Sequence, residues 1–310
     1  MTLKAALNSR PVIYEIVPPR RDTSRFSTEL RGVEDVLQDD RIAAINIPEL
    51  INRREERGVV YSPATIPPEE YAMMIKDYKE SIVNLIAPRL EREAFLLRAR
   101  KVLHEYKIPN LVLVGRERRG DILPGPEVTE GLKLLAAEKG KSTTLGGICI
   151  FSRESSGVAD GGTKVKKLPE QRRVWSKAEA GCDFVTSQII FDPNPALNFL
   201  RAYGKLCEET GRDPLTVFIS LTTIPSTSIL SLLDSLDVVV PETVRKRLST
   251  SSDMGRESLR IAEEIFHQVV SEAEKDAIRV PLGLQIEQVG VNSGELSLEL
   301  LDATYPTIRK

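Results

Sequence analysis

Apolar stretches of strand length alternate with amphipathic stretches along the whole chain. Unbroken apolar runs of this length predict strands buried on both faces, and apolar positions spaced three and four residues apart predict helices. Eight strands are predicted, at residues 11–17, 42–47, 81–87, 110–115, 144–151, 183–189, 214–220 and 279–286.

Three of the intervening segments have the clearest helical pattern, at residues 91–106, 195–210 and 254–274. We expect Asn194 to cap the second helix and Gly211 to end it, because asparagine favours N-caps and glycine favours the left-handed position after a helix. The inward faces of the first and third helices are predicted to carry Phe95, Ala99, Val102, Leu103 and Tyr106, and Leu259, Ala262, Ile265, Phe266, Val269 and Ala273.

Strands that are apolar throughout and separated by helices are typical of parallel sheets covered on both faces. Because β–α–β connections are right-handed, eight such units favour a closed (β/α)8 barrel, and we predict one barrel domain over residues 1–310. The alternative is an open doubly wound sheet. Its usual Gly-x-Gly-x-x-Gly turn after the first strand is absent here.

The charge is nearly balanced, with 43 Lys and Arg against 45 Asp and Glu and a formal net charge of −2. This balance gives no electrostatic reason to expect nucleic acid or an anionic membrane as a partner. The longest apolar runs stay well below the roughly 20 residues of a membrane helix, and the first residues lack the apolar stretch of a secretory signal. We therefore expect a cytoplasmic protein.

The cysteines and histidines exclude several kinds of site. Cys149, Cys182 and Cys207 are isolated in sequence, so neither a disulfide framework nor a zinc knuckle is indicated, and we expect all three to be buried. His104 and His267 fall on the charged sides of predicted helices, which argues against a Ser-His-Asp or Cys-His nucleophile system.

Polar residues at the carboxyl ends of the strands are the candidates for chemistry, since (β/α)8 barrels build their sites there. In PVIYEIVPPRR, Glu15 lies two residues before the apolar end of the first strand, and two prolines stop that strand. The other candidates, in chain order, are Asn46, Glu49, Arg89, Arg116, Glu117, Ser152, Arg153, Gln188 and Asp192. No lysine ends a strand, which argues against a Schiff-base aldolase, and no carboxylate–histidine cluster indicates a transition metal. Such a mouth suits proton donation and hydrogen bonding to a polar heterocycle.

Each candidate also has a purely structural interpretation. Glu15 can face water at the barrel rim, and Gln188 can be a hydrogen-bonded amide of the barrel interior. Glu117 lies in GRERRGD, a charge-rich stretch typical of a solvated loop. The glycines of VADGGTKVKK are typical of a flexible loop, although its lysines can also hold a phosphate. These are Lys164, Lys166 and Lys167.

Four segments, in order along the chain, together resemble the methylenetetrahydrofolate reductase family. YEIVPPR resembles its FEFFPP signature, IAPRL its APHLT, NLVLVGRE its hydrophobic-ALRGD, and SKAEAGCDFVTSQIIFD its KVDAGAD-hydrophobic-TQ-FFFD segment. The order and spacing of the resemblance hold from about residue 11 to residue 302. The chain thus resembles a divergent member of that family.

The resemblance implies a (β/α)8 oxidoreductase of one-carbon metabolism, a flavoprotein that passes hydride from NADH or NADPH to FAD and on to methylenetetrahydrofolate. Opening the methylene bridge needs a proton, and the resemblance gives that acid role to Glu15. A carboxyl in an apolar mouth has a raised pKa and can stay protonated near neutral pH. The resemblance further implies that Gln188, Glu117 and Arg89 bind the substrate, and that Phe151, Lys177, Glu170 and Asn46 bind the cofactor.

The departures from the family concern the flavin more than the folate. Pro48 stands where the family has a flavin-contacting threonine, and LQIEQVG replaces HFYTLN. Glu117 is the counterpart of a family aspartate in one alignment, whereas a shift of three residues makes Asp121 the counterpart. We therefore hypothesise that folate binding is retained while FAD binding is altered or lost, with hydride passing directly from the nicotinamide.

Two rival interpretations remain open. One is a folate-binding protein without its own redox step, acting as a homo-oligomer or as a subunit of a larger one-carbon complex. The other is an unrelated barrel enzyme in which Glu15 and Gln188 match the family by chance.

Overall fold

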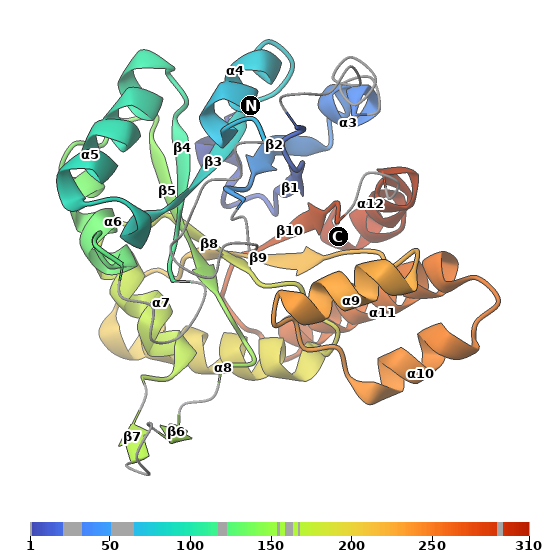
Figure 1. Cartoon of the computed structure of the whole chain (residues 1–310). Coiled ribbons are helices and arrows are strands. Elements are labelled where there is room, and N and C mark those ends of the chain that lie inside the picture. The colour runs from blue at the N-terminus through green and yellow to red at the C-terminus, as the bar shows by residue number, and fades with distance from the viewer. Residues whose placement is uncertain are drawn as a thin grey trace.

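The computed structural model describes residues 2–20, 33–50, 65–116, 123–153, 168–289 and 294–309, together with the backbone of 156–158 and 164–166. Eight parallel strands close a barrel in the order β1-β10-β9-β8-β5-β4-β3-β2. They are β1 (Val12–Glu15), β2 (Ile42–Ile47), β3 (Ser81–Ile86), β4 (Asn110–Val114), β5 (Thr144–Cys149), β8 (Phe184–Ser187), β9 (Thr216–Leu221) and β10 (Leu282–Glu287). A separate antiparallel pair, β6 (Ser156–Val158) and β7 (Lys164–Lys166), projects from the barrel (Figure 1).

The first and last strands close the barrel. Val12 to Glu15 of β1 pair in parallel with Leu284 to Glu287 of β10, and β1 also pairs with β2. This closure confirms the predicted (β/α)8 barrel and excludes the open sheet.

All eight predicted strands are present, with shifted ends. The strand predicted at 279–286 begins only at Leu282 and runs on to Glu287. Pro281 directly precedes it, and proline has no amide hydrogen for the ladder, so a strand start is where it is tolerated.

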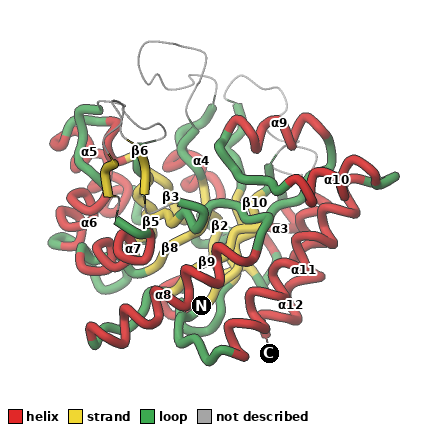
Figure 2. Tube along the Cα trace, turned by 90° about the horizontal axis from the view of Figure 1, so that it is seen from below, coloured by secondary structure: helices red, strands yellow, loops and turns green. Residues whose placement is uncertain are grey.

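The helices follow the strands and cover the outside of the barrel (Figure 2). They are α1 (Leu3–Ala6), α3 (Glu34–Gln38), α4 (Pro68–Ile75), α5 (Arg92–Arg100), α6 (Val128–Ala136), α7 (Glu170–Glu179), α8 (Pro193–Thr210), α9 (Thr227–Ser235), α10 (Glu242–Thr250), α11 (Met254–Lys275) and α12 (Gly294–Arg309). Short turns η1 (Ala87–Arg89, 3-10) and η2 (Lys101–Glu105, π) flank α5. No helix in the described ranges is long and apolar enough to cross a membrane.

The predicted cap of α8 is wrong by two residues. Asp192, not Asn194, is the N-cap, and its carboxylate accepts hydrogen bonds from both the backbone and the side-chain amide of Asn194. Asn194 is therefore already engaged and cannot cap. Gly211 ends the helix as predicted, with φ +65°.

Large rings fill the lower part of the barrel interior, and α1 closes its amino end. Phe184 and Phe218 meet edge to face, with ring centroids 5.5 Å apart, among Leu3, Leu7, Ile13, Ala44, Ile82 and Val112. Each ring lies against a glycine of a neighbouring strand. A Cβ on Gly146 would lie 2.5 Å from the Phe184 ring, and one on Gly283 would lie 2.6 Å from the Phe218 ring. The lower barrel is thus a packed core, and any site lies above it.

Candidate functional site

Above the apolar layer, the barrel interior becomes polar. Side chains alternate along a strand, so the residue two places after an interior residue also faces inward. By this rule, each apolar interior residue of the lower barrel is followed two places later by a polar interior residue. The polar residues are Glu15 after Ile13, Asn46 after Ala44, Asn84 after Ile82, Thr186 after Phe184, Ser220 after Phe218, and Gln285 and Glu287 after Gly283. The polar layer therefore comes from β1, β2, β3, β8, β9 and β10, at their carboxyl ends.

Two glutamates of this layer are joined by amides. Glu15 of β1 and Glu287 of β10 are direct register partners. Gln285 Nε2 lies 3.0 Å from Glu287 Oε1 and 3.5 Å from Glu15 Oε2, while Asn46 Nδ2 donates to Glu15 Oε2 at 2.8 Å. These four side chains form one network, which we call the carboxyl–amide network.

The environment raises the pKa of both carboxyls. Burial, followed by the charge of Glu287, raises the pKa of Glu15 well above its usual value, against a lowering by the Asn46 hydrogen bond. Burial raises the pKa of Glu287 to about 7, although the nearby Ser220 hydroxyl and the hydrogen bond from Gln285 lower it. Burial and like charge both disfavour the ionised form. Glu15 can therefore remain a proton donor near neutral pH.

The amides of the polar layer leave acceptors unused. Asn46 Oδ1, Asn84 Oδ1 and Gln285 Oε1 are buried and have no hydrogen-bond partner among the described residues. Asn46 and Gln285 are each only 2% exposed. Buried polar atoms are normally satisfied, so three unsatisfied oxygens in one layer indicate a place where a ligand brings donors.

The opposite wall of the mouth is apolar. Val114 of β4 and Ile148 of β5 are partly buried and pack against the interior cluster. The mouth thus has one acceptor-rich side and one apolar side. A flat heterocycle with N–H groups along its edge matches this combination.

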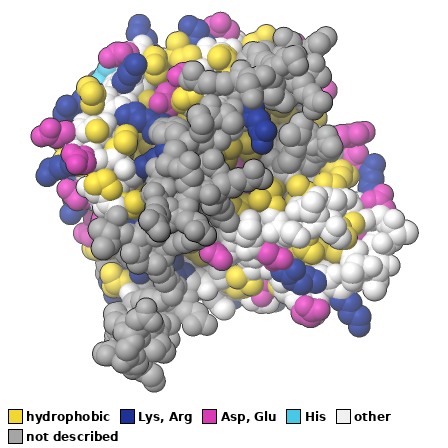
Figure 3. All heavy atoms as spheres, in the orientation of Figure 1, with side chains coloured by type: hydrophobic (Ala, Val, Ile, Leu, Met, Phe, Trp, Pro, Cys, Tyr) yellow, Lys and Arg dark blue, Asp and Glu magenta, His cyan; other side chains and the backbone are white. Residues whose placement is uncertain are grey.

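The structure places Gln188 just after β8, two residues beyond the interior Thr186. Its backbone amide donates to Cys149 O, and its Nε2 donates to Leu236 O at 3.2 Å, directly after α9. This segment is apolar at its surface: Leu232, Leu236 and Val239 are exposed, and hydrophobic side chains gather beside α9 in Figure 3. Gln188 therefore ties β8 to the α9 segment.

Arg89 belongs to a buried ion cluster rather than to the carboxyl–amide network. Its Nη1 lies 3.0 Å from Glu49 Oε1, which also pairs with Arg98 at 2.7 Å. Glu49 Oε2 accepts the Ile86 amide at 2.7 Å. The cluster ties the segment after β2 to the end of β3. The guanidinium of Arg89 thus takes part in this junction, and substrate binding by Arg89 stays a prediction.

Three residues expected at a flavin lie around the end of β5. Lys177 Nζ donates to Ile148 O at 2.7 Å, and burial lowers its pKa. Glu170 accepts the Ile150 amide and pairs with Arg153 at 2.9 Å.

Phe151, the third of them, packs on Phe199 of α8, with ring centroids 5.0 Å apart. The fourth expected residue, Asn46, donates to Glu15. Lys177, Glu170 and Phe151 are engaged in contacts within the protein, and we derive no step through FAD. FAD and NADH or NADPH stay predictions.

Some expected residues lie outside the described part of the chain. These are Glu117, Asp121 and Lys167. Lys164 and Lys166 belong to β7, of which only the backbone is described. The predicted burial of Cys149, Cys182 and Cys207 is confirmed, and His104 and His267 are exposed on their helices. No group of three potential metal ligands occurs among the described residues.

Sequence reasoning missed Gln285 and Glu287. The signal was available in LGLQIEQ, where Gly283, Gln285 and Glu287 share one face of a strand by alternation. The predicted strand stopped at 286, and LQIEQVG counted only as a loss of family residues.

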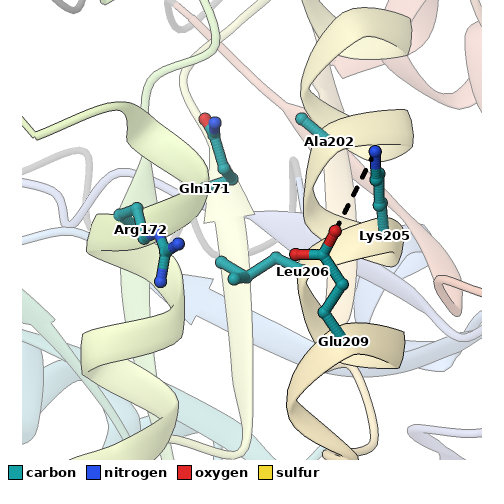
Figure 4. Close-up of a pocket in the computed structure, with 6 residues that line it drawn as sticks. All are labelled: Gln171, Arg172, Ala202, Lys205, Leu206 and Glu209. Atoms are coloured by element: carbon teal, nitrogen blue, oxygen red, sulfur yellow. Dashed lines mark ion pairs between the residues drawn. The ribbon is translucent and has the colours of Figure 1, made fainter.

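A shallow groove of about 270 Å³ lies between α7 and α8 on the outside of the barrel. Figure 4 shows its lining, with Arg172 on α7 and a Lys205–Glu209 ion pair on α8. The pair is long, 3.9 Å, and well exposed. Neither residue belongs to the carboxyl–amide network.

The fold is similar to that of an uncharacterized protein of Clostridium thermocellum, which binds two copies of 5-methyl-5,6,7,8-tetrahydrofolic acid. The two share 20% identity, with a TM-score of 0.76 over 98% of this chain and 97% of the other. Weaker likenesses are to the spore cortex-lytic enzyme SleL of Bacillus cereus (9% identity, TM-score 0.50, 96% and 74% of the chains) and to dihydropteroate synthase of Thermus thermophilus in complex with 4-aminobenzoate (13%, 0.44, 94% and 94%). No protein-family model and no curated protein matches the sequence. The likeness to the Clostridium thermocellum protein shows the barrel fold.

Proposed function

We propose that this protein binds a reduced folate at the carboxyl end of its barrel, with the pterin ring on the polar layer. The observation that carries the proposal is the Clostridium thermocellum protein, whose fold matches over nearly the entire length of both chains and which binds 5-methyltetrahydrofolate. The mouth of this chain supports it chemically. The unsatisfied oxygens of Asn46 and Gln285 would accept ring N–H groups, while Val114 and Ile148 would lie against a ring face.

Calorimetric titration of the purified chain with 5-methyltetrahydrofolate tests this proposal. We expect saturable binding, much weaker binding of p-aminobenzoylglutamate, which lacks the pterin, and about tenfold weaker binding by Gln285→Leu. Glu263→Gln on the exposed side of α11 is the matched control and should bind like the wild type. Absence of saturable binding to the wild type would refute the proposal.

A second candidate function is reduction of methylenetetrahydrofolate, favoured by the raised pKa of Glu15. In this proposal Glu15 gives its proton to a bridge nitrogen, that carbon–nitrogen bond breaks, and the resulting iminium carbon accepts hydride from NADH or NADPH. Glu15→Gln should abolish nicotinamide-dependent reduction but leave folate affinity within a few-fold, because glutamine resembles a protonated glutamate in shape. Unchanged turnover would reject Glu15 as the acid.

A further inference from the structure

In the part of the chain that the structure describes, Glu15 and Glu287 end two adjacent strands with no cationic side chain paired to either. The two residues are register partners on strands about 4.8 Å apart, and both side chains face the barrel interior. Among the described residues, neither carboxyl takes part in an ion pair. The groups that face them are neutral: Asn46 from β2, Ser220 from β9 and Gln285 from β10.

Two neighbouring carboxylates that share only neutral donors cannot both ionise easily. One proton therefore stays on the pair over a wide range of pH. Gln285 Nε2 lies between the two carboxyls, 3.0 Å from Glu287 and 3.5 Å from Glu15, while Asn46 donates to Glu15 at 2.8 Å. Burial and the charge of Glu287 raise the pKa of Glu15 well above its usual value, whereas burial raises the pKa of Glu287 to about 7, so Glu287 is the member that ionises first.

The two amides of the network point to a ligand. Asn46 and Gln285 turn their NH2 groups toward the carboxyls and leave their oxygens buried and unsatisfied within the described structure. A purely structural network would gain by satisfying these oxygens, because an unsatisfied buried acceptor is destabilising. The Glu287 carboxylate and these oxygens thus form one acceptor surface that only a donor-rich ligand completes.

We propose that Glu15 and Glu287 form a carboxyl pair that holds one proton on Glu15, and that the Glu287 carboxylate accepts a hydrogen bond from a ring N–H of a reduced pterin. This inference rests on the proposed function and deepens it, because it assigns a ligand-contacting role to Glu287. The hydrogen bond forms without net bond breaking. If Glu287 is protonated before the ligand binds, its proton is released to solvent on binding.

Binding should consequently depend on pH in one direction. Between pH 6 and pH 8, Glu287 ionises, and the affinity of the wild type for 5-methyltetrahydrofolate should rise about tenfold. The rise is one decade per pH unit below the pKa of Glu287 and levels off above it. Glu287→Gln should bind about tenfold more weakly at pH 8 and show no such rise. Glu15→Gln should keep the rise, because Glu287 is intact, and the control Glu263→Gln should match the wild type.

Infrared difference spectra of the ligand-free protein separate this inference from the proposed function. Between pH 8 and pH 6, the wild type should gain the C=O band of a newly protonated carboxylic acid, and Glu287→Gln should lack that gain. At pH 8, a protonated-acid band present in the wild type should be missing in Glu15→Gln.

Each outcome decides one proposal. If the wild type binds and Glu287→Gln keeps the same affinity rise and the same infrared gain, the inference is overturned while folate binding stands. If the wild type does not bind, the proposed function fails and with it the ligand contact of Glu287, whereas the infrared bands still decide the proton pair.

Discussion

Replacing Glu287 by glutamine should favour the stability of the protein more at alkaline pH than at acid pH. Burial raises the pKa of Glu287 to about 7 from an ordinary value of 4.5. Between pH 4.5 and about pH 7, Glu287 therefore keeps its proton in the folded state but loses it in the unfolded state. Stability is fully present below pH 4.5 and falls as the pH rises to about 7.

The magnitude follows from the difference of these pKa values. Each pKa unit corresponds to 1.36 kcal/mol, so 2.5 units correspond to about 3 kcal/mol of stability lost by the wild type above pH 7. Glu287 is only half-buried by exposed area, so solvent screens part of the charge and this value is an upper limit. Glutamine does not ionise, and the variant avoids the loss. We expect the advantage of Glu287→Gln over the wild type to be about 2 kcal/mol larger at pH 8 than at pH 5.

Urea denaturation at both pH values measures this difference, with Glu263→Gln as the exposed control. The other titrating groups cancel in the comparison except Glu15, whose pKa is raised by the charge of Glu287. Removing that charge lowers the pKa of Glu15 and adds to the advantage of the variant at alkaline pH. An equal difference at pH 5 and pH 8 would show that Glu287 titrates as an ordinary surface glutamate, and the one-proton pair would have to be abandoned.

Three further predictions concern stability and can be checked by urea denaturation. Gly146→Ala should destabilise the protein by about 1–3 kcal/mol, because its Cβ would lie 2.5 Å from the Phe184 ring. Gly204→Ala in α8 should stabilise it by about 1 kcal/mol, because the nearest atom to the new Cβ would lie at an ordinary contact distance of 3.5 Å. The opposite ranking would contradict the packing of the lower barrel. Ala277→Gly should stabilise by about 1 kcal/mol, because Ala277 follows α11 at φ +52°, where a Cβ is strained; a loss of stability would reject that strain. Glu49→Gln should destabilise the protein by about 3 kcal/mol, because it breaks buried ion pairs with Arg89 and Arg98. Glu209→Gln should change stability by less than about 1 kcal/mol, because its ion pair with Lys205 is exposed. Similar effects of the two substitutions would mean that the Glu49 cluster is solvated.

The architecture was accessible from the sequence because it depends on local signals repeated along the chain. Apolar runs located all eight strands, and Glu15 was recognisable as an acid at a strand end because two prolines stop the strand after it. The partners of such residues were not accessible. Arg89 has the same appearance in sequence as a substrate-binding arginine, and only the approach of the segment after β2 reveals Glu49 beside it.

The position of Glu287 shows why a strand end must be followed residue by residue. Shifting the predicted end of the last strand by one residue moves Glu287 from a loop to the barrel interior, opposite Glu15. The first and last strands are about 270 residues apart in sequence and adjacent in the closed barrel, so the pairing of their two glutamates depends on closure itself. An acid on β1 alone would have a pKa raised by burial only. With a second acid on β10, the proposed pair can hold one proton between neighbouring carboxyls beside unsatisfied amide oxygens, and the proposed binding of N–H donors depends on this arrangement.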